Sequence, residues 1–444
     1  MNSFEQPFRA SALLQRRAHE LIPGGAHTYA KGDDQYPALA PGFIQRGEGC
    51  HVWDVDGRRY IEFGAGNRAV GLGHAYPRVI EAARAELANG SNFTRPAAIE
   101  VECAEQFLAA IPGADMVKFC KDGSDATSAA VRLARAYTGR DLIARCEEQP
   151  FFSTDDWFIG TTPMSAGIPE QVSNLVVSFP YDDIEAVRRL FDRHPQRIAA
   201  LILEPARINE PSEGYLQALA DVCHANGALL IFDEMITGFR WDRGGAQETY
   251  GVTPDLSTFG KALANGFSVS ALAGKREFMR LGGIHHTDRP RVFLLSTTHG
   301  GETHALAAAI ATMREYAEAP VIETLYRTGT SLRIGFNALI ERHGLNGYIE
   351  VVGRPCCLLY QVRDANKKPS QAFRTLLLQE TIKRGLIMPS LVVSYAHKDE
   401  DIDRTLQAID GALAVYAKAL DQGVEKYLIG NPSQPVFRAF NQSA

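Results

Sequence analysis

The sequence lacks the features that mark membrane, secreted and nucleic-acid-binding proteins. No apolar run among its 444 residues approaches the ~20 residues that a membrane-spanning helix needs. The first residues show no apolar core of a signal peptide. The 46 Lys and Arg residues are outnumbered by 52 Asp and Glu residues, so no basic excess is present to hold a nucleic acid or an anionic lipid surface. We therefore expect a cytoplasmic protein without nucleic-acid or membrane partners.

Cysteine is scarce and scattered. The seven cysteines are odd in number, and the adjacent pair Cys356-Cys357 lacks the spacing of metal ligands. We expect reduced, mostly buried thiols and no bound metal. Internal repeats and low-complexity linkers are absent as well. What remains is a composition of 45% hydrophobic and 22% charged residues, which is typical of a globular enzyme of two or three domains.

The most informative stretch is an apolar strand that ends in two carboxylates. Residues 229–232 are four consecutive apolar residues, as in a strand buried on both faces of a parallel sheet, and Asp233 and Glu234 follow at once. Residues 254–261 form a second short apolar strand that runs into Gly260 and Lys261. Since ligands of open α/β sheets bind outside the carboxyl ends of the strands, we expect these groups to meet a ligand there.

The chemistry of these groups indicates pyridoxal phosphate (PLP). The Lys261 amine can form a Schiff base with a carbonyl compound, and the Asp233 carboxylate can keep a pyridine nitrogen protonated. Taken singly, an Asp-Glu pair after a strand is an ordinary cap or solvated turn, and a Gly-Lys pair is an ordinary loop. Taken together, they predict a PLP site.

A phosphate-binding turn is predicted upstream. Residues 115–120 read as a strand, after which Gly123 and Ser124 open an alanine-rich helix that runs to Tyr137. The free N–H groups and the positive dipole end of such a helix bind anions without any side-chain charge. The alternative is a serine that caps the helix and does nothing more. A PLP lysine elsewhere in the chain favours the phosphate interpretation.

Strands and helices alternate through the middle of the chain, so we predict an α/β fold with a mostly parallel sheet. The predicted strands cover residues 141–146, 174–179, 198–203 and 228–232, and the predicted helices cover residues 182–194 and 213–226. We assign residues 1–70 to an N-terminal segment that contributes to a small domain. Residues 71–320 form a large PLP-binding domain, and residues 321–444 form the C-terminal small domain, of α+β type.

On these residues the chain resembles the class III aminotransferases of PLP fold type I, and within them the glutamate-1-semialdehyde 2,1-aminomutase branch. The segments that carry the resemblance are residues 231–240, 257–261 and 123–135. It implies a seven-stranded, mostly parallel sheet in the large domain. It also implies an obligate homodimer with shared active sites.

The resemblance assigns cofactor contacts residue by residue. Lys261 is the Schiff-base lysine and proton shuttle, Asp233 pairs with the pyridine nitrogen, Met235 packs on one face of the ring, Asn209 lies near the ring hydroxyl, Gly123 and Ser124 bind the phosphate, and Thr298 reaches the phosphate of the neighbouring subunit.

The substrate half departs from the family pattern. A stacking tyrosine is replaced within Pro150-Phe-Phe-Ser153, which makes Phe151 the first candidate for stacking on the ring and Phe152 the second. Gly66-Asn67-Arg68 stands where the aminomutase has a tryptophan, and the segment after Ser390 lacks the aminomutase's glutamate.

The candidate substrate contacts are therefore assigned separately from the cofactor contacts. Arg68 and Lys31 are candidate partners for a substrate anion, and His27 and Tyr29 are candidate polar contacts. The alternatives are a structural ion pair for Arg68 and an ordinary surface loop for residues 27–34.

Three functions remain open. The first is transfer of an amino group from an amino donor to a small ketone or aldehyde, such as a keto sugar or a biosynthetic intermediate. The second is intramolecular amino transfer of the glutamate-1-semialdehyde 2,1-aminomutase type. The third is a PLP-fold protein without catalysis, which the presence of both Lys261 and Asp233 disfavours.

Overall fold

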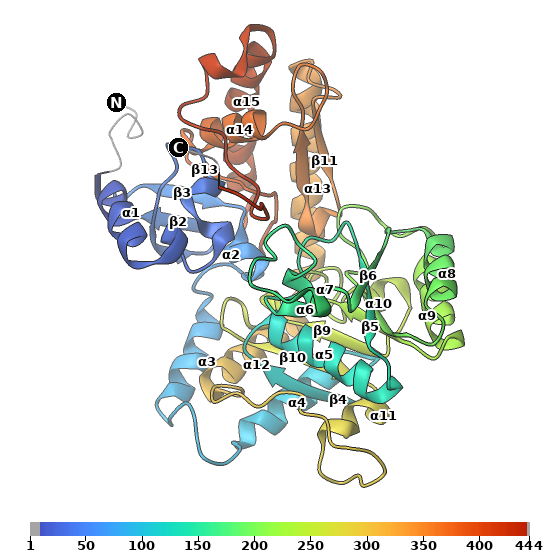
Figure 1. Cartoon of the computed structure of the whole chain (residues 1–444). Coiled ribbons are helices and arrows are strands. Elements are labelled where there is room, and N and C mark those ends of the chain that lie inside the picture. Colours follow the sequence, from blue (N-terminus) through green and yellow to red (C-terminus); the bar gives the residue numbers. More distant parts are fainter. Residues whose placement is uncertain (1–8, 442–444) are drawn as a thin grey trace. The chain divides into compact units, whose positions relative to one another are not determined.

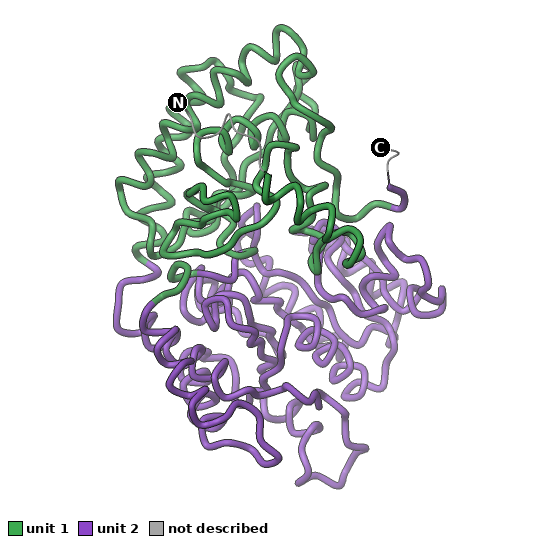
Figure 2. The backbone as a smooth tube through the Cα atoms, turned by 90° about the vertical axis from the view of Figure 1, so that its left-hand side faces the viewer, with its two compact units in different colours: residues 1–67, 71–76, 323–438 green, residues 68–70, 77–322, 439–444 purple. Residues whose placement is uncertain are grey.

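The computed structural model describes residues 9–441, so the outer ends of the expected terminal domains lie outside the described residues. The chain divides into two compact units, which Figure 2 shows in different colours. Unit 1 comprises residues 1–67, 71–76 and 323–438, and unit 2 comprises residues 68–70, 77–322 and 439–444. The boundaries expected at residues 70 and 320 remain expectations about domains, and each unit is described by itself.

Unit 2 is built on a seven-stranded sheet with the strand order β4-β10-β9-β8-β7-β5-β6 (Figure 1). Every strand runs parallel to its neighbours except β10, which is antiparallel to both β4 and β9. The α/β class and the mostly parallel sheet are thus confirmed. The strands are β4 (Met116–Cys120), β5 (Leu142–Cys146), β6 (Val176–Phe179), β7 (Ile198–Leu203), β8 (Leu229–Asp233), β9 (Leu256–Phe259) and β10 (Ser270–Gly274).

The central strands are continuous apolar runs because helices cover the sheet. Every residue of β7, β8, β9 and β10 is buried. The helices α8 (Ile184–Arg193) and α9 (Tyr215–Ala225) share one hydrophobic core with β5–β8. In α8 the apolar residues Val187, Leu190 and Phe191 recur at helical spacing and are the buried ones, which is the pattern of an amphipathic helix.

The remaining long helices of unit 2 pack around the other end of the sheet. α5 (Gly123–Thr138) contacts β4, β7, β8, β9 and β10, and α12 (Thr303–Glu318) packs against α3 (Pro77–Leu87) and α4 (Ala98–Ala110). Four short helices lie between them: α6 (Asp156–Ile159), α7 (Glu170–Ser173), α10 (Ala246–Tyr250) and α11 (Arg276–Met279). The sequence pattern did not predict these short helices, because four or five residues are too few to show a period.

The parallel strands place five chain segments at one edge of the sheet. The carboxyl ends of β4, β5, β7, β8 and β9 all point to this edge, because β4 and β9 are both antiparallel to β10. Asp233 is the last residue of β8. Gly123, Phe151, Glu204 and Lys261 follow the other four strands in the chain. Residues more than 130 positions apart in sequence therefore share one edge.

Unit 1 contains a four-stranded sheet of the order β1-β2-β3-β13. Its strands are β1 (Ile44–Glu48), β2 (His51–Asp54), β3 (Arg59–Glu62) and β13 (Leu386–Ile387). The β2–β3 hairpin turns at Asp56-Gly57, and Gly57 has φ 84°, which the tight turn requires. A second hairpin joins β11 (Ile349–Val352) to β12 (Leu359–Val362).

Helices from both ends of the chain complete unit 1. They are α1 (Arg9–Leu21), the kinked turn α2 (Ala65–Arg68), α13 (Val321–Arg342), α14 (Gln371–Ile382) and α15 (Asp399–Gln422), of which α14 and α15 pack together. The last residue of α2 and the first two residues of α13 belong to unit 2. Within the described residues, no helix combines the length and the apolar character that a membrane crossing requires.

A cluster of aromatic rings supports β9, the strand that leads to Lys261. Phe107 of α4 is fully buried and meets Phe119 and Phe259 edge-on, with ring centroids 5.9 and 5.3 Å away. We expect Phe107→Ala to lower the free energy of unfolding by about 3–5 kcal/mol, because the lost ring leaves a cavity at the base of β9. Denaturant unfolding of the variant measures this value. The control is Phe93→Ala, which removes a half-exposed ring, and an equal loss in both variants would contradict the assignment.

Candidate active site

Asp233 is fixed at the carboxyl end of β8 by two hydrogen bonds to one oxygen. Its Oδ1 accepts from the Met235 N–H at 3.0 Å and from the Thr258 hydroxyl of β9 at 3.2 Å. The residue is only 4% exposed. Burial raises the pKa of its carboxyl to about 7, against the lowering influence of Lys261. The carboxyl is thus oriented, desolvated and in need of a cationic partner.

Lys261 follows β9 and opens a short 3-10 helix, Lys261–Ala264. Its backbone has φ 48°, a left-handed conformation that costs energy for any residue except glycine. Burial lowers the pKa of its amine, and the carboxylates of Asp233 and Glu204 act in the opposite direction. A lysine with a lowered pKa has more of the neutral amine that acts as a nucleophile or a base.

The Met235 side chain packs against two glycines, Gly123 and Gly260. Gly123 precedes Ser124, and Gly260 precedes Lys261. A Cβ atom on Gly123 would lie 3.0 Å from the Met235 sulfur, and a Cβ atom on Gly260 would lie 2.7 Å from it. Met235 itself is only 6% exposed. The absence of side chains at both glycines lets the start of α5, the end of β8 and the Lys261 turn approach one another closely.

The N-terminus of α5 meets the requirements of an anion site. The Asp122 side chain caps the helix by accepting from the Asp125 N–H at 3.0 Å, and its carbonyl accepts from the Ala126 N–H. The N–H groups of Gly123 and Ser124 come first in the helix, where the helix itself supplies no acceptor. The Ser124 hydroxyl oxygen accepts a hydrogen bond from the Thr154 N–H at 3.0 Å. This turn is thereby tied to the segment after β5.

Glu234, the second carboxylate of the pair, has a structural role. It is fully buried, and its oxygens accept from the N–H groups of Ala246 and Gln247 at 2.8 and 2.9 Å and from the Thr237 hydroxyl. Burial raises the pKa of Glu234. The carboxylate closes the loop after β8 onto the start of α10. Side chains alternate in direction along an extended chain, so Asp233 and Glu234 point to opposite sides. Asp233 can therefore meet a ligand while Glu234 holds the start of α10.

Phe151 and Phe152 occupy different environments. Phe152 is 1% exposed, and its carbonyl accepts from the Thr127 hydroxyl of α5 at 2.8 Å. Phe151 is 44% exposed. Both rings meet Phe158 edge-on, at 5.8 Å for Phe151 and 5.7 Å for Phe152. The exposed ring is the one with a face left for a ligand, so Phe151 stays the first candidate for stacking.

Arg68 and Arg240 add positive charge next to Lys261, whose pKa both of them lower. Arg240 is fully buried, and its Nη2 donates to the Arg68 carbonyl at 2.8 Å. Its Nε and Nη1 groups are buried without an acceptor among the described residues. Such donors are rarely left unsatisfied, so they are available to an acceptor atom of a ligand.

The remaining predicted residues lie in exposed positions. Asn209 lies in the loop after β7, and Thr298 lies in the loop before α12, where its carbonyl accepts from Asn92 at 3.0 Å. His27, Tyr29 and Lys31 belong to unit 1 and have exposed side chains. The roles of these five residues stay predictions.

Two residues that affect the pKa of Lys261 were not among the candidate site residues, although Glu204 directly follows a predicted strand and Arg240 ends the segment 231–240 that carries the family resemblance. Glu204 follows β7, is 5% exposed, and affects the pKa of both Asp233 and Lys261. A carboxylate directly after an apolar strand was the available signal, the same one that identified Asp233. Arg240 stands seven residues beyond Asp233, and only the structure reveals that it is buried.

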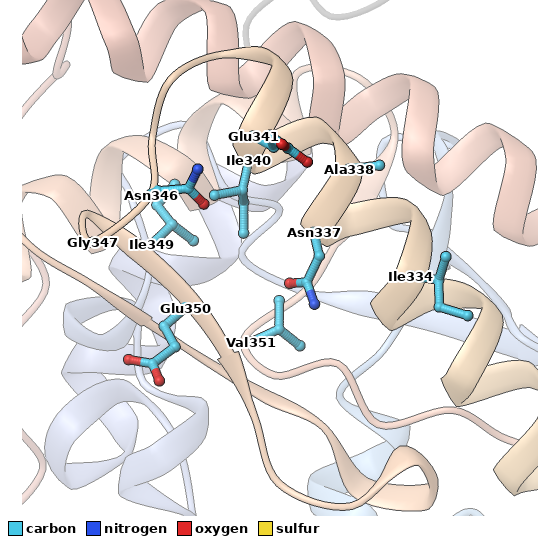
Figure 3. Close-up of a pocket in the computed structure, with 10 residues that line it drawn as sticks. All are labelled: Ile334, Asn337, Ala338, Ile340, Glu341, Asn346, Gly347, Ile349, Glu350 and Val351. Carbon is cyan, nitrogen blue, oxygen red and sulfur yellow. The ribbon is translucent and has the colours of Figure 1, made fainter.

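A pocket of about 690 Å³ in unit 1 contains none of the predicted site residues (Figure 3). Residues of α13 and of the β11 region line it, among them Ile334, Asn337, Glu341 and Glu350. It holds no lysine, cysteine or histidine. The catalytic chemistry therefore belongs to the sheet edge of unit 2.

The residues at that edge fit a PLP molecule. The buried Asp233 carboxyl, whose pKa burial raises, and the unsatisfied N–H groups of Arg240 match an anionic, aromatic ligand with a ring nitrogen that can be protonated. Lys261 supplies the amine that such an aldehyde requires.

Comparison with known proteins places this site in a family. The model of the family "Aminotransferase class-III" matches residues 29–413. The chain is 34% identical over 426 residues to a protein named glutamate-1-semialdehyde 2,1-aminomutase from Desulforudis audaxviator, an alignment that covers 90% of this chain and 97% of the relative. A protein of the same name from Methanothermobacter thermautotrophicus is 34% identical over 429 residues, with 91% and 99% covered.

Solved structures agree. The PLP-bound FumI protein of Sphingopyxis sp. MTA144 superimposes with a TM-score of 0.85 at 30% identity, with 93% of this chain and 97% of that chain covered. An omega-transaminase from Sphaerobacter thermophilus gives a TM-score of 0.83 at 27% identity, with 94% and 100% covered.

The raised pKa of Asp233 makes the stability of the cofactor-free protein depend on pH. Between its ordinary pKa of 3.8 and about 7, the folded state retains a proton that the unfolded chain has lost, so stability falls as the pH rises through this window. Asp233→Asn removes this effect. We therefore expect the variant to gain stability relative to the wild type from pH 4 to pH 8, by at most about 4 kcal/mol.

Urea unfolding of both cofactor-free proteins across this pH range measures the difference. The matched control is Asp141→Asn, which changes an exposed carboxylate at the start of the β5 segment. A stability difference between Asp233→Asn and the wild type that is the same at pH 4 and pH 8 would show that the carboxyl is not desolvated.

Proposed function

Because the chain belongs to the class-III aminotransferases, we propose that it transfers an amino group from an amino donor to a small ketone or aldehyde, such as a keto sugar or a biosynthetic intermediate. The protein is an enzyme whose cofactor is PLP. The prediction of an enzyme is confirmed, so the non-catalytic interpretation is set aside. The observation that carries the proposal is the pair of Lys261 and Asp233, buried at one sheet edge and each shifting the pKa of the other.

The cofactor supplies an aldehyde that carries the amino group and a ring that takes up electrons. The Asp233 carboxyl, oriented by Met235 and Thr258, keeps the proton on the ring nitrogen. The N–H groups of Gly123 and Ser124 hold the phosphate at the start of α5. In this proposal the partner subunit's Thr298 contacts the same phosphate, which makes a homodimer the functional unit.

Lys261 binds the cofactor and moves protons. Its lowered pKa keeps a share of the amine neutral, and the neutral amine can accept a proton from the substrate carbon and return it elsewhere. The opposing influence of Asp233 and Glu204 limits this effect. Phe151 stacks on the ring, whereas Asn209 contributes from the loop after β7.

Arg68 is the substrate residue that the local geometry supports best. It belongs to the Gly66-Asn67-Arg68 segment that stands where the aminomutase pattern has a tryptophan, and these three residues have φ values of 57°, 59° and 70°. Three successive left-handed residues form a strained turn, and strain of this kind is concentrated at functional sites. The turn ends at a guanidinium that acts on the Lys261 amine. In this proposal an anionic group of the substrate is the partner of this cation, whereas the substrate roles of Lys31, His27 and Tyr29 stay predictions.

The aminomutase alternative is favoured by the names of the curated relatives. Against it stand the changed residues 66–68 and the missing glutamate after Ser390, both in the substrate half. Two reactions are thus compared on one cofactor site, and they differ in whether a second molecule donates the amino group.

A single-turnover experiment separates the two reactions. The enzyme is loaded with pyridoxamine phosphate and mixed with one oxo compound at a time. We expect the absorbance of the PLP form to return and one aminated product to be released in an amount equal to the enzyme. Lys261→Ala is the control and should lose turnover by several orders of magnitude, since it lacks both the Schiff base and the proton shuttle.

The outcome that contradicts the proposal is also defined. Conversion of glutamate-1-semialdehyde to its amino-transferred isomer without any external donor, together with no response to other oxo compounds, would establish the aminomutase reaction instead.

Arg68→Ala tests the substrate contact. Loss of one charge-assisted hydrogen bond, worth about 1.5–3 kcal/mol, should raise KM for an anionic substrate about 10- to 150-fold. The cofactor's absorption spectrum should stay unchanged, and Arg68→Lys should recover part of the affinity. The control is Arg314→Ala. Arg314 lies on α12, and its exposed side chain pairs with Glu102. An unchanged KM in Arg68→Ala would return Arg68 to a structural role.

A further inference from the structure

A second group of potential ligand atoms lies in unit 1. Cys50 and His51 lie at the turn between β1 and β2, and Asp401 lies in the first turn of α15. One donor atom from each of the three residues lies within 4.8 Å of the other two. Cys50 is 3% exposed and Asp401 is 8% exposed. The sequence alone does not indicate this group, because Asp401 lies about 350 positions from Cys50 and His51.

The imidazole and the carboxylate face each other without forming a hydrogen bond. His51 Nε2 lies 3.3 Å from Asp401 Oδ1, and yet it is buried and has no hydrogen-bond partner among the described residues. Asp401 Oδ2 is already occupied, since it accepts from the Lys398 N–H at 3.1 Å and caps α15. Asp401 Oδ2 therefore caps α15, whereas Oδ1 faces His51 Nε2, which has no hydrogen-bond partner among the described residues.

This separation is the one that two ligands of a single metal ion adopt. Zinc bonds to nitrogen and oxygen are about 2.0–2.2 Å long, so a tetrahedral site places the two ligand atoms about 3.3–3.5 Å apart. The Cys50 sulfur, one ring nitrogen of His51 and one carboxylate oxygen of Asp401 lie within 4.8 Å of one another, which brings all three residues within reach of one ion. Thiolate, imidazole and carboxylate together form a donor set that suits zinc and does not suit calcium or magnesium.

The charges around the group permit a divalent cation. The thiolate and the carboxylate would carry two negative charges, which a divalent ion balances. Without such an ion, burial and the Asp401 carboxylate raise the pKa of the Cys50 thiol, so binding must release its proton. Other charges that act on His51 are the cations of Arg59 and Arg404 and the carboxylate of Glu48.

The neighbouring histidine does not oppose a cation. His397 is 4% exposed, and both Asp401 and His51 affect its pKa. Burial lowers that pKa to about 4, so its ring is neutral at pH 7.

We propose that Cys50, His51 and Asp401 bind one zinc ion, with water as the fourth ligand. The ion would join the β1–β2 turn to the start of α15 and so connect the N-terminal and C-terminal segments of unit 1. Because the ion binds the folded state, in which the three residues lie together, its binding adds stability to that state. The role is structural and independent of the PLP chemistry.

Metal titration of the PLP-bound enzyme tests the proposal. Protein treated with chelator and exchanged into metal-free buffer is titrated with Zn²⁺ and separately with Co²⁺. We expect one zinc per chain, a higher thermal midpoint, and cobalt absorption bands at the red end of the visible spectrum, where the PLP cofactor does not absorb. Loss of a residue that hydrogen-bonds to a metal ligand lowers metal affinity about 10- to 100-fold. Cys50→Ser removes a ligand itself, so it should weaken zinc binding by more than that.

Two further variants keep the test decisive. Cys357→Ser changes another buried thiol of unit 1 and should bind zinc as the wild type does. Asp401→Asn keeps an oxygen to cap α15 but removes the charge, so it serves if Cys50→Ser does not fold, and it should also lose zinc. Absence of stoichiometric zinc in the wild type, or equal binding by the wild type and both ligand variants, would overturn the proposal.

Discussion

The site depends on the desolvation of two groups that would each be charged in water. Asp233 and Lys261 are held at the end of a sheet whose strands are buried on both faces, and burial is the largest influence on the pKa of both. Burial favours the neutral form of each, so the carboxyl gains affinity for a proton and the amine loses it. A cofactor that brings a basic ring nitrogen and an aldehyde satisfies both groups at once. The desolvation of Asp233 and Lys261 in the empty site therefore favours binding of such a cofactor.

That desolvation requires close packing, which the glycines provide. Met235 closes the space beside Asp233 only because Gly123 and Gly260 carry no Cβ atom. The two glycines are 137 positions apart, and one opens the phosphate-binding helix while the other precedes the lysine. A side chain at either position would move Met235, admit water beside the carboxyl and reduce the electrostatic coupling. In the proposed site, phosphate binding, ring binding and amine reactivity therefore share one packing constraint.

The sequence predicted the strands that lead to Asp233 and Lys261 because their signals are local. Apolar runs that end in Asp233 and Lys261, and a Gly-Ser turn before an alanine-rich helix, each follow from the order of strands in a parallel sheet. Glu204 and Arg240 escaped, since their relevance arises from burial and from neighbours distant in sequence. The antiparallel β10 also lies beyond sequence reasoning, because an apolar strand reads the same in either direction. Glu234 shows the converse: its place beside Asp233 suggested chemistry, whereas its hydrogen bonds show a structural role.

The proposed substrate contacts lie on loops, whereas the proposed cofactor contacts lie on regular elements. Membership of the family therefore leaves the substrate undetermined. The cofactor contacts lie on strand ends and a helix start, where the sheet fixes their positions. The proposed substrate contacts lie on turns: Arg68 follows three strained residues, and Phe151 belongs to the irregular segment after β5. Loops tolerate substitution because few buried contacts depend on them. In the proposed site, the change at residues 66–68 can therefore alter which oxo compound is accepted while Asp233, Met235 and Lys261 stay in place, so this proposal assigns substrate choice to charge on the loops and reactivity to burial in the sheet.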